Sequence, residues 1–242
     1  MANKTAVIIG VGPIEGLGAQ LCIHAAREGL HVVIAGRTET KLHAVADVIA
    51  NEKGEATPVV TDVTDEDGVV SLVQQAETIG PIGLAVYNAG NNYNGNFLDL
   101  EADFFERAWR VCTFGGFLFA RETLKAMVTR SGGTLLFTGA SASMRGKPNF
   151  APFTMAKAGL RAMAQSLARE FQPKGIHVGH VVIDGGINGE KIKSNVPDLA
   201  ARVGEDGLIG LEGIASAYMY LYNQPKNAWT HELDLRTYKE TF

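Results

Sequence analysis

Glycines form the first group of residues that could do chemistry. Gly10, Gly12, Gly16 and Gly18 lie between a short apolar run and an amphipathic stretch that begins near Leu17. Glycines let the backbone approach a diphosphate closely, and the first turn of a following helix offers free N–H groups to its oxygens. A plain turn could use the same residues. Because this loop would join the first strand to the first helix, we favour a dinucleotide-binding loop.

The residue expected near the adenosine ribose is basic. The usual fingerprint has a carboxylate about 20 residues further on, at the tip of the second strand, and here that tip reads Gly36-Arg37. A guanidinium can bind a 2′-phosphate, and no carboxylate there repels it, so the sequence favours NADP(H) and leaves NAD(H) possible. Glu15, in the glycine loop, argues the other way. The alternative for Arg37 is a solvated surface charge.

A second group of candidate residues lies in the middle of the chain. Phe153 and Lys157 are four residues apart, so in a helix they share one face, but a phenyl ring cannot donate a proton. Ser141, at the expected end of a strand, could donate a hydrogen bond to a substrate oxygen or simply cap a turn. Arg145 and Lys147, just beyond it, are expected to be solvated, and the alternative is contact with an acidic substrate.

Two kinds of segment alternate along the chain, and together they must position these residues. Short β-branched apolar runs are typical of buried parallel strands, and helix-length amphipathic segments separate them. The expected strands are Thr5–Ile9, Val32–Ala35, Thr57–Thr61, Leu84–Tyr87, Thr134–Phe137, His177–Ile183 and Thr230–Leu235. The expected helices are Gly16–Glu28, Thr38–Lys53, Asp65–Thr78, Asp103–Arg130, Ala151–Phe171 and Leu211–Asn223.

This alternation predicts an α/β fold, a Rossmann-like doubly wound parallel sheet flanked by helices. No linker or repeat interrupts residues 1–242, so we expect a single domain. Within the helix Asp103–Arg130, Gly115-Gly116 would either let another helix approach closely or be a tolerated pair. Residues 184–210 are glycine-rich and too long for a simple connection, so we expect an irregular loop that shapes a substrate pocket.

Composition excludes several classes of protein. The formal net charge of -4 and the 46% hydrophobic content argue against a nucleic-acid binder and a disordered chain. The two cysteines cannot form a disulfide framework, and neither they nor the six histidines show a metal-ligand spacing, so we expect no metal and a reduced, cytoplasmic setting. No targeting peptide or membrane helix is expected.

The ordered set of motifs resembles the short-chain dehydrogenase/reductase family over essentially the whole chain. Its pieces are the glycine loop, Asp62-Val63 after the third strand, Asn88-Ala89-Gly90 after the fourth, and Lys157. The resemblance implies that Asp62 contacts adenine, that the Asn88 turn supports the adenosine side, and that Lys157 binds the nicotinamide ribose. It also implies a homodimer or homotetramer that contacts through the two long helices.

The loop and the resemblance together give a set of expected cofactor contacts. They are Gly10, Gly12, Gly16, Leu17, Gly18, Arg37, Asp62, Val63, Asn88, Ala89, Gly90, Lys157, Gly185 and Ile187.

The departures from the family pattern concern the active site. Phe153 occupies the position of the family's tyrosine, and Cys112 aligns with its helper asparagine. The family's serine aligns at or beside Ala140, with Ser141 next to it, and its Pro-Gly pair reads Asp184-Gly185. The resemblance is therefore to an atypical branch.

These residues lead to one expected function and two alternatives. We expect an NADP(H)-dependent oxidoreductase that transfers a hydride to or from a small carbonyl or alcohol substrate, with Ser141 and Lys157 as catalytic residues and Phe153 in the tyrosine position. The alternatives are a reductase of C=C bonds and a catalytically weak NADP(H)-binding sensor or assembly protein. Tyr93 is the tyrosine we would test as a replacement acid. A nucleic acid or a membrane is not an expected partner.

Overall fold

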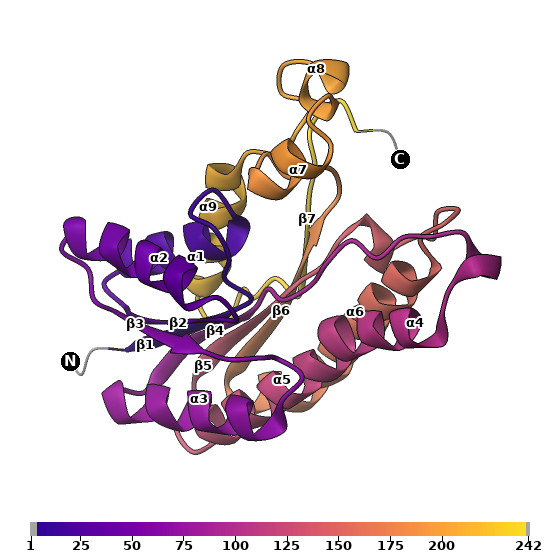
Figure 1. The fold of residues 1–242 in the computed structure, drawn as a ribbon. Coiled ribbons are helices and arrows are strands. Elements are labelled where there is room, and N and C mark those ends of the chain that lie inside the picture. The colour runs from indigo at the N-terminus through magenta and orange to yellow at the C-terminus, as the bar shows by residue number, and fades with distance from the viewer. Residues whose placement is uncertain (1–3, 241–242) are drawn as a thin grey trace.

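A sheet of seven parallel strands forms the centre of the computed structural model, which describes residues 4–240 (Figure 1). The strand order β3-β2-β1-β4-β5-β6-β7 starts at β1 and winds outward in both directions, as predicted. The strands are β1 (Thr5–Ile9), β2 (His31–Gly36), β3 (Ala56–Val60), β4 (Ile82–Tyr87), β5 (Gly133–Thr138), β6 (Ile176–Ile183) and β7 (Glu232–Leu235). Residues 1–3, where we expect no targeting segment, lie outside the described residues.

Helices cover both faces of the sheet (Figure 1). One face carries α1 (Leu17–Arg27), α2 (Glu39–Asn51) and α9 (Leu211–Tyr222). The other carries α3 (Glu66–Ile79), α5 (Gly115–Val128) and α6 (Ala151–Phe171), with α4 (Ala102–Trp109) packed on α6. Within residues 4–240, no helix is both long and apolar enough to cross a bilayer.

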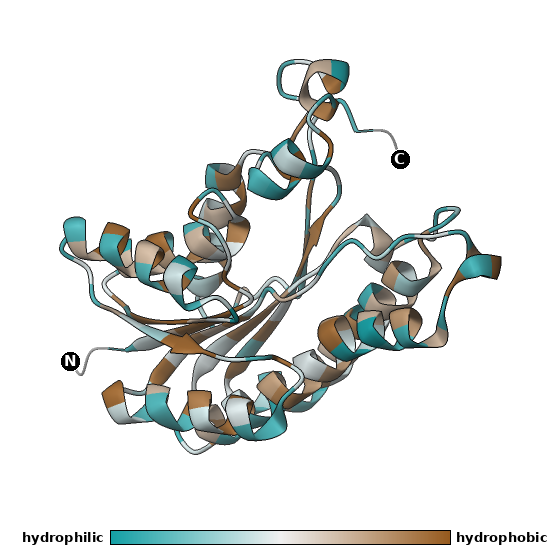
Figure 2. Cartoon of the chain, in the orientation of Figure 1, coloured by the Kyte–Doolittle hydropathy of each residue, from teal (hydrophilic) through white to brown (hydrophobic). Residues whose placement is uncertain are grey.

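The strands are apolar on both sides because both sides are covered. Along β1, Ala6 and Ile8 pack into one core cluster, and Val7 and Ile9 pack into the other. Figure 2 shows the resulting brown strands at the centre of the molecule. The exceptions are the two edge strands: β3, which was expected to be buried, and β7 are only partly buried.

The predicted helix Asp103–Arg130 is instead three segments. A π-helical turn, η2 (Arg110–Phe114), separates α4 from α5. The hydroxyl of Tyr87, at the end of β4, donates a hydrogen bond to the carbonyl of Val111 in this turn. A side chain that bonds to a helical carbonyl competes with the backbone ladder, and π-turns of this kind are one recognised cause of an irregular helix.

The pair Gly115-Gly116 follows this turn, and neighbouring side chains approach both residues too closely for a Cβ atom. A Cβ on Gly115 would lie 2.6 Å from the Tyr87 hydroxyl oxygen, and one on Gly116 would lie 2.7 Å from Leu160 of α6. Of the two readings left open by the sequence, the structure favours tight packing.

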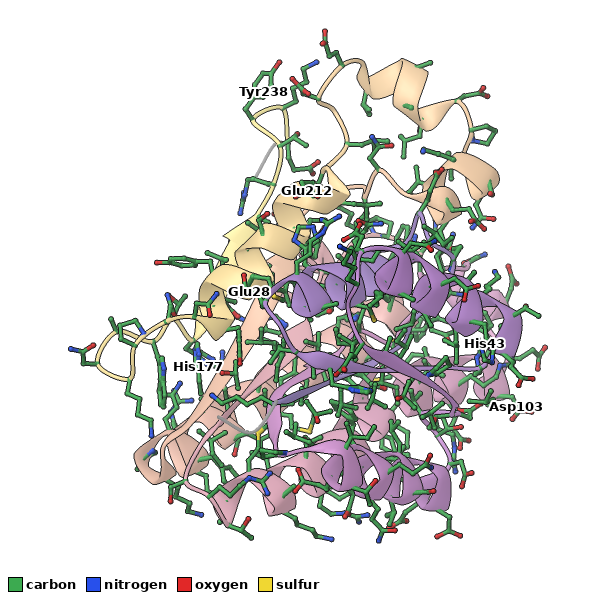
Figure 3. All side chains as sticks on the ribbon, turned by 90° about the vertical axis from the view of Figure 1, so that its left-hand side faces the viewer. Glu28, His43, Asp103, His177, Glu212 and Tyr238 are labelled. Atoms are coloured by element: carbon green, nitrogen blue, oxygen red, sulfur yellow. The ribbon has the colours of Figure 1, made fainter. Side chains whose placement is uncertain are left out.

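Residues 184–210 are more regular than expected. They contain two short helices, α7 (Glu190–Asn195) and α8 (Leu199–Val203), and the Ile209 amide donates to the Gly186 carbonyl at 2.8 Å. The following helix, α9, contacts α1 at both of its own ends. Glu212, in its first turn, lies 3.0 Å from His24 of α1, and Asn223, at its end, lies 3.0 Å from Glu28, which follows α1; Figure 3 labels the two glutamates. These contacts fix the helix that follows residues 184–210.

Gly115→Ala should destabilise the protein by about 1–3 kcal/mol, because the new methyl group would overlap the Tyr87 hydroxyl. Gly213→Ala is the matched control, since a Cβ there meets nothing within 4 Å and Gly213 lies in α9. The control should raise stability by about 0.5–1 kcal/mol through helix propensity. Urea denaturation measures both, and equal effects in the two variants would contradict the packing argument.

Candidate functional site

The glycine loop lies at the carboxyl edge of the sheet, between β1 and α1. Gly10 has a φ of +92°, and a Cβ on it would lie 2.4 Å from the Ala89 nitrogen. A Cβ on Gly18 would lie 2.8 Å from the Gly10 carbonyl oxygen. Gly12 differs, because a Cβ there would meet nothing within 4 Å. The loop is therefore packed on its inner side and open on its outer side, the arrangement that a diphosphate needs.

The first turn of α1 is available to a ligand. Gly16 is its N-cap residue, and no side chain caps it. Leu17 anchors the start of this helix and is buried. The free N–H groups of a helix start carry partial positive charge, so they favour an anion.

A chain of hydrogen bonds connects this loop to the middle of the sheet. The Asn88 side-chain amide donates to the Gly10 carbonyl at 3.1 Å, and the Thr138 hydroxyl donates to the Asn88 side-chain oxygen at 3.1 Å. The Thr138 hydroxyl also lies 2.7 Å from the Tyr218 hydroxyl, which must be the donor because the threonine proton is already used. The ammonium of Lys157 donates to the Thr138 carbonyl at 2.7 Å.

Thr138 is the residue that sequence reasoning missed. It is the last residue of β5 and is buried, so the available signal was a polar residue at the carboxyl end of an apolar strand. Its hydroxyl contacts Asn88, which follows β4, and its carbonyl accepts a hydrogen bond from Lys157 of α6. Thr138 therefore places Asn88 and Lys157 in one network.

Lys157 is the most unusual titratable group at this edge. It is 4% exposed, and burial lowers the pKa of its ammonium, an effect opposed by the Cys112 thiol and reinforced by Lys191. Its nitrogen lies 6.0 Å from the centre of the Phe153 ring. Gly90 packs against both Lys157 and Cys112, because a Cβ on it would lie 3.2 Å from the Lys157 nitrogen and 3.5 Å from the Cys112 sulfur.

Ser141 begins a short 3-10 turn, η3 (Ser141–Ser143), directly after β5. Its neighbour is Asp184, the fully buried residue that follows β6. Burial by itself would raise the pKa of Asp184, but hydrogen bonds from Arg145 and Ser141 and the charges of Arg145 and Arg236 outweigh it and lower the pKa. The carboxylate is thus anionic beside the serine.

Arg145 was expected to be solvated, and this expectation was wrong. Its guanidinium makes two hydrogen bonds to the Asp184 carboxylate, at 2.8 and 2.9 Å, and its side chain is 32% exposed. The paired geometry matches the planar fork of arginine to a carboxylate. Lys147 is exposed, as expected.

A second polar network lies beneath Ser141. The ring of His180, fully buried on β6, lies 3.0 Å from the Glu232 carboxylate and 3.4 Å from the Ser143 hydroxyl. Glu232 in turn accepts two hydrogen bonds from Arg161, at 2.6 and 2.7 Å. Burial lowers the pKa of His180 to about 4 despite the neighbouring Glu232.

The residues expected to bind adenosine lie at the tips of β2 and β3. Arg37 is exposed and forms no ion pair with the residues that the structure describes. Asp62 accepts hydrogen bonds from the Thr64 amide and hydroxyl, at 2.8 and 2.7 Å, which together with the charge of Arg37 outweigh desolvation and lower its pKa. Val63 is buried beside Asp62.

The remaining predicted contacts lie on the segment that follows β6. Gly185 has a φ of +156°, and Ile187 bridges to Ile209 and packs on the core. Tyr93 packs edge-on against Phe104 with ring centres 5.6 Å apart, and burial raises the pKa of its phenol. Among residues 4–240, no cluster of three or more His, Cys, Asp or Glu side chains could hold a metal ion.

Comparisons with known proteins agree with this geometry. A sequence profile described as short chain dehydrogenase matches residues 4–197. An uncharacterized oxidoreductase of Staphylococcus aureus is 26% identical over 240 residues, which cover 98% of both chains. Versicolorin reductase of Emericella nidulans is 31% identical over 182 residues, which cover 74% of this chain and 67% of that protein.

Solved structures share the fold. A short-chain dehydrogenase from Rhodopseudomonas palustris is 33% identical with a TM-score of 0.84, over 98% of this chain and 99% of that chain. A variant of actinorhodin polyketide ketoreductase with NADPH has a TM-score of 0.88 at 22% identity, over 97% of this chain and 96% of that chain. This chain belongs to the short-chain dehydrogenase family and is an oxidoreductase of that family.

His180 should make stability depend on pH. Its pKa is about 4 in the folded chain against 6.5 for an ordinary histidine, so the unfolded chain takes up the proton first. Stability that is present above pH 6.5 should be lost between pH 6.5 and about 4, by roughly 3 kcal/mol. Urea denaturation across this range measures the loss.

In the His180→Gln variant this part of the pH dependence should disappear. His43→Gln is the control, because the His43 side chain is 60% exposed and its removal should leave the slope unchanged. A slope in His180→Gln equal to that of the unaltered protein would show that other groups cause the acid sensitivity.

Proposed function

We propose that the protein is an NADP(H)-dependent oxidoreductase that transfers a hydride to or from a small carbonyl or alcohol substrate. The observation that carries the proposal is the position of Lys157, whose buried ammonium is connected through Thr138 and Asn88 to the carbonyl of Gly10. One network thus includes both the residue expected at the nicotinamide ribose and the loop expected at the diphosphate.

The residues fit such a cofactor. Gly12 leaves open space above the loop, and the uncapped start of α1 offers N–H groups to an anion. Two structural neighbours support the type of cofactor: the actinorhodin polyketide ketoreductase structure is with NADPH, and that of an alcohol dehydrogenase from Thermococcus sibiricus is complexed with 5-hydroxy-NADP. When bound, the nicotinamide supplies or accepts the hydride.

Arg37 favours NADP(H) over NAD(H), because its guanidinium would bind the 2′-phosphate more strongly than the uncharged 2′-hydroxyl of NAD(H). Arg37 has no ion pair within residues 4–240, so its guanidinium is free to bind a phosphate. The objection raised by Glu15 is met by Lys193, whose ammonium lies 2.8 Å from the Glu15 carboxylate and lowers its pKa. The glycine loop therefore presents a neutralised carboxylate to the cofactor.

Lys157 is the proposed proton source in carbonyl reduction. The alkoxide that forms at the substrate must gain a proton, and Phe153 cannot give one. Burial lowers the pKa of the Lys157 ammonium, which makes it a stronger acid than an exposed lysine. Ser141 would exchange its Asp184 partner for the substrate oxygen and hold it by a hydrogen bond.

Two further parts of the molecule would serve this function, the segment 184–210 and the surface of α5 and α6. Residues 184–210, with α7 and α8, would shape the pocket for a small-molecule substrate. A second copy of the chain would dock on α5 and α6, where Phe117 and Val128 are exposed apolar residues beside a cavity of about 440 Å³. A homodimer or homotetramer is the expected assembly.

NADPH should protect the protein from heat more than NADH does. A ligand at about 100 times its Kd adds about 2.7 kcal/mol of stability, which thermal denaturation detects as a clear rise in Tm. Arg37→Ala should remove the advantage of NADPH and leave the effect of NADH unchanged. Arg169→Ala, at an exposed position on α6, should change neither. Equal protection of the unaltered protein by both nucleotides would contradict the assignment of Arg37, and no protection by either would contradict the proposed function.

Phe153→Tyr should raise the rate of carbonyl reduction by about 10²-fold or more, because it adds a phenol beside Lys157. Consumption of NADPH with a panel of aldehydes and ketones measures the gain. Adding Lys157→Ala should abolish it, and Phe150→Tyr, just before α6, is a matched control that should give none. If Phe153→Tyr gives no gain while conjugated enones are reduced, the C=C reductase is the correct function.

A further inference from the structure

Lys191, on α7, reaches across the carboxyl edge of the sheet. Its ammonium lies 3.4 Å from the carbonyl oxygen of Gly90, which follows β4. This is a long hydrogen bond, and the Lys191 side chain as a whole is exposed. A weak contact to a neutral carbonyl does not compensate a full positive charge, so the ammonium retains most of its capacity for an anion.

The charges around Lys191 come from both ends of the expected cofactor site. Loss of water around the ammonium, followed by the charges of Arg37 and Lys41, lowers the pKa of Lys191, and the Cys112 thiol opposes this shift. Lys191 in turn lowers the pKa of Lys157. Lys191 also contacts Gly90, where a Cβ would lie 3.2 Å from the Lys157 nitrogen, so it lies near the nicotinamide side, marked by Lys157, and within electrostatic range of the adenosine side, marked by Arg37.

Nearby carboxylates are already engaged. Asp62, which feels the charge of Arg37, is held by two hydrogen bonds from Thr64. Glu15 is paired with Lys193. Arg37 and Lys41 form no ion pair within the described part of the chain, from residue 4 to residue 240. Among the described residues, these two cations and Lys191 outnumber the one carboxylate, Asp62, that interacts with Arg37, so this arrangement favours an anionic ligand.

The segment that carries Lys191 is fastened to the glycine loop. The Glu190 amide donates to the Glu15 carbonyl at 2.8 Å, and the Lys193 ammonium lies 2.8 Å from the Glu15 carboxylate. A Cβ on Gly189 would lie 2.8 Å from the Glu15 carbonyl oxygen, so the two backbones touch. In Figure 1, α7 is the orange helix above the indigo segment that includes α1. These contacts hold the start of α7, which carries Lys191, against the glycine loop.

We infer that Lys191 is a ligand of the cofactor's diphosphate, which its ammonium would bind after leaving the Gly90 carbonyl. The inference rests on the proposed function. The diphosphate is the central part of a dinucleotide, and Lys191 contacts Gly90 beside Lys157 while its segment is hydrogen-bonded to the glycine loop at Glu15. The 2′-phosphate, by contrast, belongs to the Arg37 end.

Lys191→Gln tests the assignment by binding rather than by turnover. The amide removes the charge and keeps a polar, flexible side chain. Titration calorimetry with NADPH and with NADH should show Kd values raised about 10-fold for both, with their ratio unchanged. Affinity for adenosine 2′-monophosphate, which has no diphosphate, should stay the same in this variant and fall in Arg37→Ala.

Lys226→Gln is the matched control. Lys226 also contacts a backbone carbonyl, that of Ser131 at 3.2 Å, but on a loop before β7 and far along the chain from the glycine loop. It should leave every Kd unchanged, and an equal loss in this variant would overturn the inference as a general charge effect. A loss in Lys191→Gln that is confined to NADPH would also overturn it, because Lys191 would then bind the 2′-phosphate.

The two proposals fail in different ways. If the unaltered protein binds NADPH and Lys191→Gln binds it equally well, the inference about Lys191 is wrong and the proposed function stands. If the unaltered protein binds neither nucleotide, the proposed function is wrong. Thermal denaturation of Lys191→Gln without nucleotide should match that of the unaltered protein, which shows that the fold is retained.

Discussion

The hydrogen bond between Asn88 and Thr138 is the constraint on which the site depends. β4 and β5 are neighbours in the sheet, and this bond ties together the chain segments that leave them. Through Asn88 it fixes the glycine loop at Gly10, and through the Thr138 carbonyl it fixes Lys157. Because Thr138 and Lys157 are buried, a missing partner would leave an unsatisfied polar atom, and the network therefore favours one arrangement.

The polar groups after β5 and along β6 pair with one another. Asp184 lies beside both Ser141 and Arg145. His180 connects Ser143 to Glu232. Charged and polar side chains thus hold one another in place around these strands, while the phenyl ring of Phe153 has no proton to give.

The sequence predicted those features that depend on local pattern. Alternating apolar runs and helices gave the sheet, and the position of the glycine loop after β1 followed from spacing. Features set by distant partners were not predictable. The π-helical turn depends on Tyr87, 24 residues before Val111, and the pairing of Arg145 depends on Asp184, 39 residues later. Thr138 acts through neighbours that only the folded sheet brings near.

The π-helical turn has a consequence for how this chain can vary in length. It holds one residue more than a regular helix would use in the same rise, and the capture of the Val111 carbonyl by Tyr87 keeps that residue in place. Loss of a single amino acid within Arg110–Phe114 would remove this extra residue and leave a regular helical turn, so α4 and α5 would keep their orientation about the helix axis. Loss of a residue inside α4 or α5 has no such compensation and would rotate one side of the helix against the other by about 100°. Homologues should therefore tolerate a one-residue deletion at this turn more readily than one inside either helix.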